Sequence, residues 1–462
     1  MPSLPGTAPR IGIADSLRAV IDPWLDATRA GCDMVVTPGR LTDSAEWHVT
    51  DGRIAHRSGG FFSVVGVGVA PDPARGLSGV VSPIIDQPEV GLLGFVAHRA
   101  GDEVEILVQA KPEPGNVGLA QVAPTVQATR SNYLRLHGGR PTVLLEAFSD
   151  PGAVAVRVPQ SEQGSRFLGK YNDNAMVFLD RRITEPGDEF AWFPVDAVLD
   201  ALGSDFAVNT DARSVLVTAG PSALVRHREP FARPDTGSFG ELLAASYRAG
   251  RADPIPTDDA ERRLADARRT FRFAVEPVSV EALAPWVLDD RGLTDPAGEL
   301  AVVHVAVTTS QREVPAWDQP LVTTPAPGDT VLLAQWRHDR LRFCFTCTPE
   351  VGLGEHVQVH PSVQRTPGPA LRFAELDERD AALAALSAEA TTVASALQSD
   401  EGGRFLDCVG RYSVALLPET TTVPDLAHTL WLSWDQIEAL ARRKGFFTNE
   451  ARSVVSLVLG RA

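Results

Sequence analysis

The chain has 462 residues, more than a single hydrophobic core usually supports, so its length predicts two domains. Hydrophobic residues make up 44% and charged residues 22%, which is ordinary for a soluble globular protein, and the net charge of −16 disfavours nucleic acid as a partner. We expect no signal peptide and no membrane span, and the four scattered cysteines favour a reducing cytoplasm over a disulfide framework.

An internal repeat organises the chain. Residues 109–127 read QAKPEPGNVGLAQVAPTVQ, and residues 346–364 read TCTPEVGLGEHVQVHPSVQ. Three more pairs of strings recur in the same order: DQP at 86 and 318, QSxxGxRFL at 160 and 398, and ARSV at 212 and 451. These collinear matches predict a duplicated domain, with copies at 1–222 and 255–462 and a linker at 223–254.

Each copy is predicted to contain the same series of elements. In the first copy, an apolar run at 61–67 precedes the DQP turn, and strands follow at 90–96 and 104–108. Apolar residues at 195, 198, 199 and 202 then lie on one face of a short helix, and Trp434 and Ile437 begin the same face in the second copy. We interpret the apolar segments 214–218 and 453–458 as closing strands.

The stretch between the copies, roughly residues 219–257, is rich in proline and charge. We expect a linker that packs on the surface, with one possible helix at 239–248. The mixture of strands and helices predicts α/β or α+β sandwiches and not an all-β barrel.

The first copy is polar at positions where the second is not. Lys111 aligns with Thr348, and Lys170 aligns with Cys408. We therefore predict that catalysis belongs to the first copy and that the second has a structural or ligand-holding role. The alternative is that the second copy has only diverged in its loops.

Long strings in both copies resemble the signatures of a known family, the NDP-hexose 2,3-dehydratases. The resemblance spans nearly the whole chain, so it is far more specific than a short motif. The strings are QPEVGLLGF at 87–95, QAKPEPGN at 109–116, QVAPTVQATRSNY at 121–133, QSEQGSRFL at 160–168, QSDEGGRFL at 398–406 and NEARSVV at 449–455.

This resemblance implies a fold, a reaction and partners. It implies a tandem duplication in which each copy is a mixed-sheet sandwich of the Nudix-hydrolase type, and a homodimer. The implied substrate is a dTDP-4-keto-6-deoxyhexose, and the implied product is a 3,4-diketo-2,6-dideoxy sugar for antibiotic deoxysugar synthesis. A separate NADPH-dependent 3-ketoreductase would act on that product. The dehydratase itself would need no redox cofactor, and no hydrolytic Nudix box is visible.

One segment departs from the family pattern. After QSEQGSRFL the family continues with a basic run, whereas this chain has Tyr171 and Asp173 where arginines are expected. Two alternatives to the lyase therefore stay open. One is a catalytically altered protein that binds a nucleotide sugar, and the other is a dehydratase or isomerase of a different keto sugar.

Elimination beside a ketone needs a base, an acid and donors for the enolate oxygen. Lys111 and Glu113 lie two apart at a strand exit and so share a face, which makes them an acid/base pair or, alternatively, a surface ion pair. Glu162 is a second carboxylate candidate unless it only caps a turn. Tyr133 could donate to the ketone or stack on the nucleotide base.

Other polar residues of the same segments are candidates for substrate binding. Arginine and lysine suit the diphosphate, and the glutamines and threonine could read the pyrimidine, although a fold-holding salt bridge or a buried amide network would also explain some of them. The candidates are Gln121, Thr125, Gln127, Arg130, Ser131, Asn132, Gln160, Ser161, Gln163, Arg166 and Lys170. We predict one cleft in the first copy, lined by Lys111, Glu113, Arg130, Tyr133, Glu162, Arg166 and Lys170.

No metal site is expected. Cys344 and Cys347 resemble half of a zinc site, but they lie three apart in a predicted strand and would face opposite sides of it. His356 and His360 have no third ligand nearby in the sequence.

Overall fold

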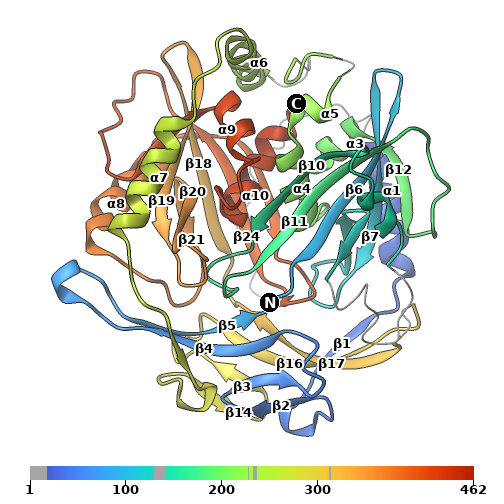
Figure 1. The fold of residues 1–462 in the computed structure, drawn as a ribbon, viewed down its shortest axis with the longest axis vertical. Helices are drawn as coiled ribbons and strands as arrows, with labels where there is room; N and C mark the ends of the chain where they lie inside the picture. Colours follow the sequence, from blue (N-terminus) through green and yellow to red (C-terminus); the bar gives the residue numbers. More distant parts are fainter. Residues whose placement is uncertain (1–17, 130–141, 227, 233–236, 312–313) are drawn as a thin grey trace.

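The computed structural model of the chain describes residues 18–129, 142–226, 228–232, 237–311 and 314–462. Two large sheets lie side by side, and two smaller sheets lie against them at one end of the molecule (Figure 1). Among the described residues, no helix is long and apolar enough to cross a membrane. The architecture is mixed α+β with several sheets, as the sequence predicted.

The first large sheet has strand order β10-β11-β6-β7-β12, with β8 paired to β7 and β9 paired to β6. The pairing of β6 with β11 is parallel and the others are antiparallel. The two strands predicted at 90–96 and 104–108 are confirmed as β6 and β7. The strand bounds are β6 (Gly91–Ala100), β7 (Glu103–Pro112), β8 (Ala120–Ala123), β9 (Val126–Ala128), β10 (Val154–Ser161), β11 (Tyr171–Leu179) and β12 (Phe190–Pro194).

The second large sheet repeats this arrangement. Its order is β20-β19-β18-β24-β22, with β21 on β18 and β25 on β19, and again one central pairing, β18 with β24, is parallel. Each strand has a counterpart in the first sheet with the same neighbours, as a duplicated domain requires. The bounds are β18 (Gly328–Arg337), β19 (Arg340–Pro349), β20 (Val357–Pro361), β21 (Val363–Arg365), β22 (Thr391–Ser399), β24 (Val409–Leu416) and β25 (Thr429–Ser433).

The two small sheets exchange strands between the halves. The first has order β13-β4-β3-β2 with β5 on β4, so β13 of the second half extends a sheet of the first. The second has order β14-β15-β16-β17-β23, and β1 of the first half pairs with β16. The bounds are β1 (Val35–Pro38), β2 (Trp47–Thr50), β3 (Arg53–His56), β4 (Ser63–Val69), β5 (Val80–Asp86), β13 (Glu276–Val278), β14 (Val287–Asp289), β15 (Gly292–Thr294), β16 (Ala301–Thr308), β17 (Ala316–Thr323) and β23 (Phe405–Leu406).

Short helices close each half, and the predicted helical faces at 195–202 and from Trp434 are confirmed as α3 and α9. The α-helices are α1 (Arg18–Gly31), α3 (Val195–Ala201), α4 (Thr210–Ala219), α5 (Pro221–Leu224), α6 (Gly237–Ala252), α7 (Asp258–Thr270), α8 (Asp377–Glu389), α9 (Trp434–Leu440) and α10 (Asn449–Leu459). The 3-10 helices are η1 (Leu41–Asp43), η2 (Pro73–Arg75), η3 (Leu145–Ser149), η4 (Val280–Ala282) and η5 (Ala374–Leu376).

The closing strands predicted at 214–218 and 453–458 are wrong, because both segments are helical. They form most of α4 and α10, whose residues are buried throughout. A helix buried on every face has no polar stripe, so a short apolar run does not distinguish it from a strand. The caps were the missed signal: Asn209 accepts a hydrogen bond from the Ala212 amide, and Thr448 accepts one from the Ala451 amide.

Helices α4 and α10 pack against each other and join the halves into one core. Arg213 on α4 donates to the Ser456 hydroxyl at 2.9 Å, and Arg452 on α10 donates to the Ser214 hydroxyl at 2.7 Å. Both arginines are at most 1% exposed, and each donates hydrogen bonds to groups of both halves. The contact between the halves is therefore made by buried residues, as in the core of a single domain.

The stretch between the copies is more than a surface connection. The predicted helix at 239–248 is confirmed within α6, but this helix buries Phe239, Leu243 and Tyr247 against the second half. Their spacing of four residues places them on one face of the helix.

Candidate functional site

An ion pair with a buried carboxylate lies at the exit of strand β7. The Lys111 Nζ is 2.7 Å from the Glu113 Oε1, and the Glu113 side chain is 4% exposed. Gln127 Nε2 also donates to the Glu113 Oε1, at 3.4 Å, and Asn209 donates to the Gln127 Oε1 at 3.1 Å. The predicted shared face of Lys111 and Glu113 is confirmed, and with Glu113 buried and Lys111 17% exposed the pair is not a surface ion pair.

Glu162, at the end of β10, is held by two amides. Its Oε1 accepts a hydrogen bond from Asn172 Nδ2 at 2.7 Å, and its Oε2 accepts one from Asn449 Nδ2 at 3.0 Å. Asn172 belongs to β11 of the first half, whereas Asn449 belongs to α10 of the second half. The carboxylate is therefore oriented by both halves of the chain.

Lys170 precedes β11 and is 5% exposed. Its ammonium donates to the Glu89 carbonyl oxygen. Burial lowers the pKa of Lys170 to about 8, and the charge of Glu162 opposes this shift. The lysine is thus an ammonium at pH 7 that is held in a poorly solvated place, where an anionic ligand would be a favourable partner.

A loop of the second half, residues 400–407, completes this group of charges. The Gly402 carbonyl accepts a hydrogen bond from the Gly115 amide at 2.9 Å, and the Asp407 amide donates to the Gly115 carbonyl at 3.0 Å. Within the loop, Glu401 and Arg404 are electrostatic neighbours of Lys170. Sequence reasoning missed both residues because it assigned this loop to the second copy alone.

Burial and neighbouring carboxylates raise two pKa values in the group. Burial raises the pKa of Glu401 to about 7, reinforced by Glu113 and opposed by Arg404 and Lys111. Burial also raises the pKa of Asp211, on α4, well above its usual range. We call the group the first cluster, and its charged members are Lys111, Glu113, Glu162, Lys170, Asp211, Glu401 and Arg404.

A second cluster is formed by the equivalent residues with the halves exchanged. Gln163 donates to the Asp400 Oδ1 at 3.0 Å, and Arg166 donates to the Pro367 carbonyl at 2.5 Å. Both first-half residues line a cavity with Asp400 and Glu450 of the second half. The prediction of one cleft is therefore wrong for Arg166, and Gln163 likewise lies in the second cluster.

The reason for this misplacement is the exchange of loops. Just as Gly402 meets Gly115, the Gly352 amide donates to the Gly164 carbonyl at 2.7 Å, and the Gly169 amide donates to the Gly352 carbonyl at 2.7 Å. Each QSxxGxRFL loop thus crosses to the other half.

Carboxyl groups dominate the second cluster. Burial raises the pKa of Asp400 to about 6 and that of Glu450 to about 7, and Arg166 opposes both shifts. Glu350, the counterpart of Glu113, has a pKa well above its usual range because of burial and the charge of Glu450. The ammonium groups of Lys111 and Lys170 are replaced here by the neutral side chains of Thr348 and Cys408, so this cluster is the poorer anion site.

Four other candidates lie in a buried network between strands and halves. Gln121 donates to the Ser399 hydroxyl at 2.6 Å, and Ser161 donates to the Gln358 Oε1 at 2.6 Å, two contacts related by the repeat. This arrangement favours the alternative of a buried polar network for Gln121, Thr125, Gln160 and Ser161. Four further candidates, Arg130, Ser131, Asn132 and Tyr133, lie outside the described residues.

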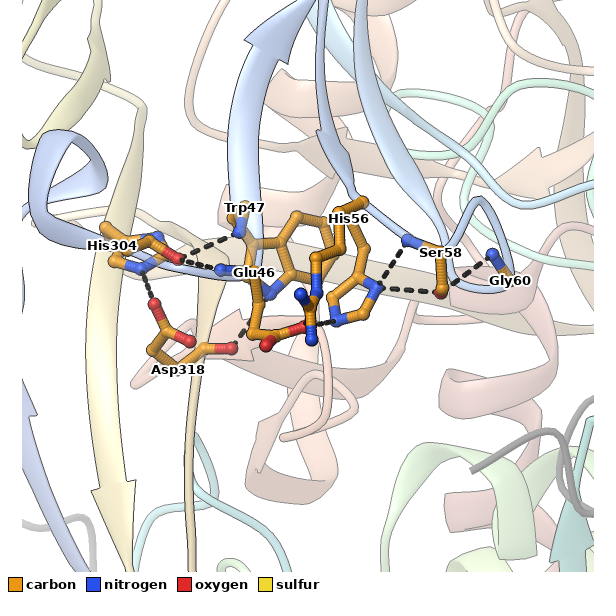
Figure 2. Close-up of polar contacts among 9 residues, drawn as sticks. Glu46, Trp47, His56, Ser58, Gly60, His304 and Asp318 are labelled. Atoms are coloured by element: carbon orange, nitrogen blue, oxygen red, sulfur yellow. Dashed lines mark hydrogen bonds and ion pairs between the residues drawn. The ribbon is translucent and has the colours of Figure 1, made fainter. Parts of the chain in front are cut away.

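A separate set of polar contacts lies where the small sheets meet (Figure 2). His304 Nε2 is 2.7 Å from the Asp318 Oδ2, and His56 bridges Glu46, at 3.2 Å, and the Ser58 Oγ, at 2.8 Å. Glutamate, histidine and serine are the residue types of a catalytic triad. However, Ser58 is exposed, and its hydroxyl accepts a hydrogen bond from the Gly60 amide within the turn, so we assign this set a structural role.

The two cysteines of β19 lie on opposite faces of the strand, as predicted. Cys344 packs in the core cluster under α8, and Cys347 packs in the central core. Burial raises the pKa of each thiol to about 12. Over the part of the chain that the structure describes, no three His, Cys, Asp or Glu side chains are grouped so that they could hold a metal ion.

Fold and site together define a duplicated α+β protein in which an acid/base cluster is completed by both copies. A family model described as NDP-hexose 2,3-dehydratase matches residues 18–218 and 257–458. The chain therefore belongs to the NDP-hexose 2,3-dehydratase family, as its sequence strings indicated.

Three relatives share the name dTDP-4-dehydro-6-deoxy-alpha-D-glucopyranose 2,3-dehydratase. The protein from Saccharopolyspora spinosa is 30% identical over 414 residues, which cover 87% of this chain and 83% of that protein. The one from Streptomyces violaceoruber is 31% identical over 451 residues, covering 94% and 95%. The one from Amycolatopsis orientalis is 31% identical over 418 residues, covering 88% and 82%.

Proposed function

We propose that this protein is a lyase that removes water across C2 and C3 of a dTDP-4-keto-6-deoxyhexose. The observation that carries the proposal is the first cluster of a chain of this family, in which the Lys111–Glu113 ion pair and the Glu162 and Lys170 side chains share Glu401 as an electrostatic neighbour. Paired carboxylates supply the proton transfers of an elimination, and buried cations suit the diphosphate.

The reaction is an elimination followed by a tautomerisation, and each stage moves protons. The C4 ketone acidifies the C3 hydrogen, so a base removes that proton and the electron pair forms an enolate. The enolate then expels the C2 hydroxyl, which takes a proton and leaves as water while the C2–C3 double bond forms. The resulting enol then loses the proton of its 3-hydroxyl and takes a proton at C2, which gives the 3,4-diketo-2,6-dideoxy sugar. No net oxidation or reduction occurs, so a redox cofactor is not required.

We assign the base to Glu113. An ammonium within ion-pair distance favours the ionised carboxylate, and the Lys111 Nζ lies 2.7 Å from its Oε1. Glu162 accepts two amide hydrogen bonds, which suits a carboxylate that orients ligands and neighbouring side chains. We assign Lys170 to the diphosphate because its ammonium is buried and has a lowered pKa.

The departure at positions 171 and 173 does not argue against this activity. Asp173 forms an ion pair with Arg157 at 2.8 Å, at the surface of β10 and β11. The Tyr171 hydroxyl accepts a hydrogen bond from Gln358 of the second half at 3.5 Å, and Lys444 lies over its ring. Both side chains have partners apart from the first cluster, which keeps its own cations.

The test is a coupled assay. The purified protein is incubated with dTDP-4-keto-6-deoxyglucose, with and without an NADPH-dependent 3-ketoreductase. We expect a trapped 2,6-dideoxy sugar only when both enzymes are present. Binding of the nucleotide sugar without turnover would favour the altered binding protein, and turnover of another keto sugar alone would favour the second alternative.

Finer features come from the family resemblance and belong to this proposal. We propose that each large sheet with its helices is related to the Nudix-hydrolase fold, that the protein is a cytoplasmic homodimer, and that it serves antibiotic deoxysugar synthesis. Light scattering tests the dimer, which should have roughly twice the chain mass of 49.5 kDa. A species of the chain mass would contradict it.

A further inference from the structure

Glu401 belongs to the second half of the chain but lies in the first cluster. Its loop is fixed there by the hydrogen bond from the Gly115 amide to the Gly402 carbonyl. A Cβ added at Gly115 would lie 1.5 Å from the Phe405 carbonyl oxygen, so the two loops are in backbone contact without space for a side chain. The position of Glu401 relative to the exit of β7 is therefore set by backbone contacts.

The internal repeat provides a comparison for this residue. Gln163 is the counterpart of Glu401, and it crosses to the second cluster in the same way, where it donates to the Asp400 carboxylate at 3.0 Å. The loop thus accepts either a neutral amide or a carboxyl group at this position. The carboxyl group lies in the cluster that also has Lys111 and Lys170, and the amide lies in the cluster that lacks them.

The charges that face Glu401 come from several elements. Glu113 and Lys111 face it from β7, Arg404 from its own loop, and Glu162 from the end of β10. Asp211 of α4 and Lys170 are electrostatic neighbours as well. Burial is the largest cause of its raised pKa of about 7. A bound diphosphate would add negative charge and raise this pKa further, so the carboxyl group would be protonated in the complex.

We propose that Glu401 is the general acid of the elimination and gives its proton to the departing C2 hydroxyl. This inference rests on the proposed function. After Glu113 takes the C3 proton, the C2–O bond breaks, the Glu401 O–H bond breaks and water leaves. Glu401 is then a carboxylate. In the tautomerisation that follows, protonated Glu113 gives its proton to C2, and the proton of the 3-hydroxyl passes to Glu401, so both carboxyl groups are restored. The second copy is therefore a contributor to the active site and not only a support for it.

The experiment compares wild type with Glu401→Gln, which places at this position the side chain that Gln163 has in the equivalent loop. Wild-type turnover of dTDP-4-keto-6-deoxyglucose is measured first and tests the proposed function itself. For the variant we expect dehydration to fall by roughly a hundredfold or more. Deuterium uptake at C3 from D₂O should continue in recovered substrate, because the base is intact. Affinity for dTDP should be unchanged.

Two further variants separate chemistry from structure. Glu401→Asp keeps a carboxyl group and should recover part of the turnover. Asp407→Asn removes an exposed carboxylate from the same loop, at a backbone φ of 50° that asparagine accepts, and should behave as wild type. The alkaline fall of wild-type kcat, which reports loss of the acid's proton, should be absent in Glu401→Gln.

Three results would overturn the assignment. One is wild-type turnover in Glu401→Gln. Another is an equal loss of dehydration and of deuterium uptake, which would make the residue a base or a structural support. The third is a Glu401→Asp variant as inactive as Glu401→Gln although both keep the thermal stability and dTDP affinity of wild type.

Discussion

Replacing Lys170 by methionine should stabilise the protein at pH 7 while weakening nucleotide binding. Burial lowers the pKa of Lys170 from 10.5 to about 8, and each pKa unit corresponds to about 1.4 kcal/mol. Holding the ammonium in the folded state therefore costs about 3 kcal/mol. Methionine removes this cost, but it also removes the hydrogen bond to the Glu89 carbonyl, which offsets about 1–2 kcal/mol. The free energy of unfolding of Lys170→Met at pH 7 should therefore exceed that of wild type by about 1–2 kcal/mol.

The dependence on pH gives this prediction its sharpest check. Because the folded-state pKa of Lys170 is lower than the unfolded one, the native protein releases this proton first as pH rises. The destabilisation that Lys170 causes in wild type therefore disappears between pH 8 and pH 10.5. Across that window the difference in free energy of unfolding between Lys170→Met and wild type should shrink. The counterpart, Cys408, shows that the fold accepts an uncharged side chain at this position.

Urea unfolding of wild type and Lys170→Met at pH 7, 8, 9 and 10 measures this difference. In parallel, dTDP affinity of wild type should fall above pH 8, by roughly tenfold, as the ammonium loses its charge. The variant should bind weakly at every pH. A lower urea midpoint of the variant at pH 7, or a difference that stays constant up to pH 10, would refute the reasoning.

Three other changes have definite expectations. Lys111→Met removes the cation beside Glu113 and should lower kcat by roughly tenfold to a hundredfold, with the fall largest at low pH, as steady-state rates against pH would show. Arg452→Met leaves several buried acceptors unpaired and should destabilise the fold by about 3–5 kcal/mol in urea unfolding. Gly115→Ala should lower the free energy of unfolding by at least about 1–3 kcal/mol and remove most of the turnover. The control is Gly31→Ala, where a Cβ meets nothing within 4 Å, and it should leave stability and turnover unchanged.

Much of the secondary structure was predictable because local patterns determine it. Strands β6 and β7 follow from apolar, β-branched runs, and α3 follows from the spacing of its apolar residues. The Lys111–Glu113 contact follows from the period of two along a strand. Helices α4 and α10 were missed because burial on all sides leaves no periodic signal, so only their caps distinguish them from strands.

The membership of the site was predictable only in part, because a repeat does not reveal which half a loop contacts. The alignment pairs Arg166 with Arg404 correctly, but it is equally compatible with each loop folding onto its own half or onto the other. The contacts of Arg166 with Pro367, and of Gly115 with Gly402, are long-range and have no local signature. For this reason the sequence alone does not single out Glu401, and it predicts Arg166 for the first cleft.

The crossed loops also explain how the charged residues are distributed between the two copies. The second copy has Thr348 and Cys408 where the first has lysines, yet it has Arg404 and the carboxyl group of Glu401. Those two residues serve the first cluster, so the requirement for them persists even where the second cluster is not a catalytic site. Arg166 of the first copy serves the second cluster reciprocally, because its charge opposes the rise that burial causes in the pKa values of Asp400 and Glu350. In a duplicated protein with exchanged loops, each copy is therefore constrained by the chemistry of the other.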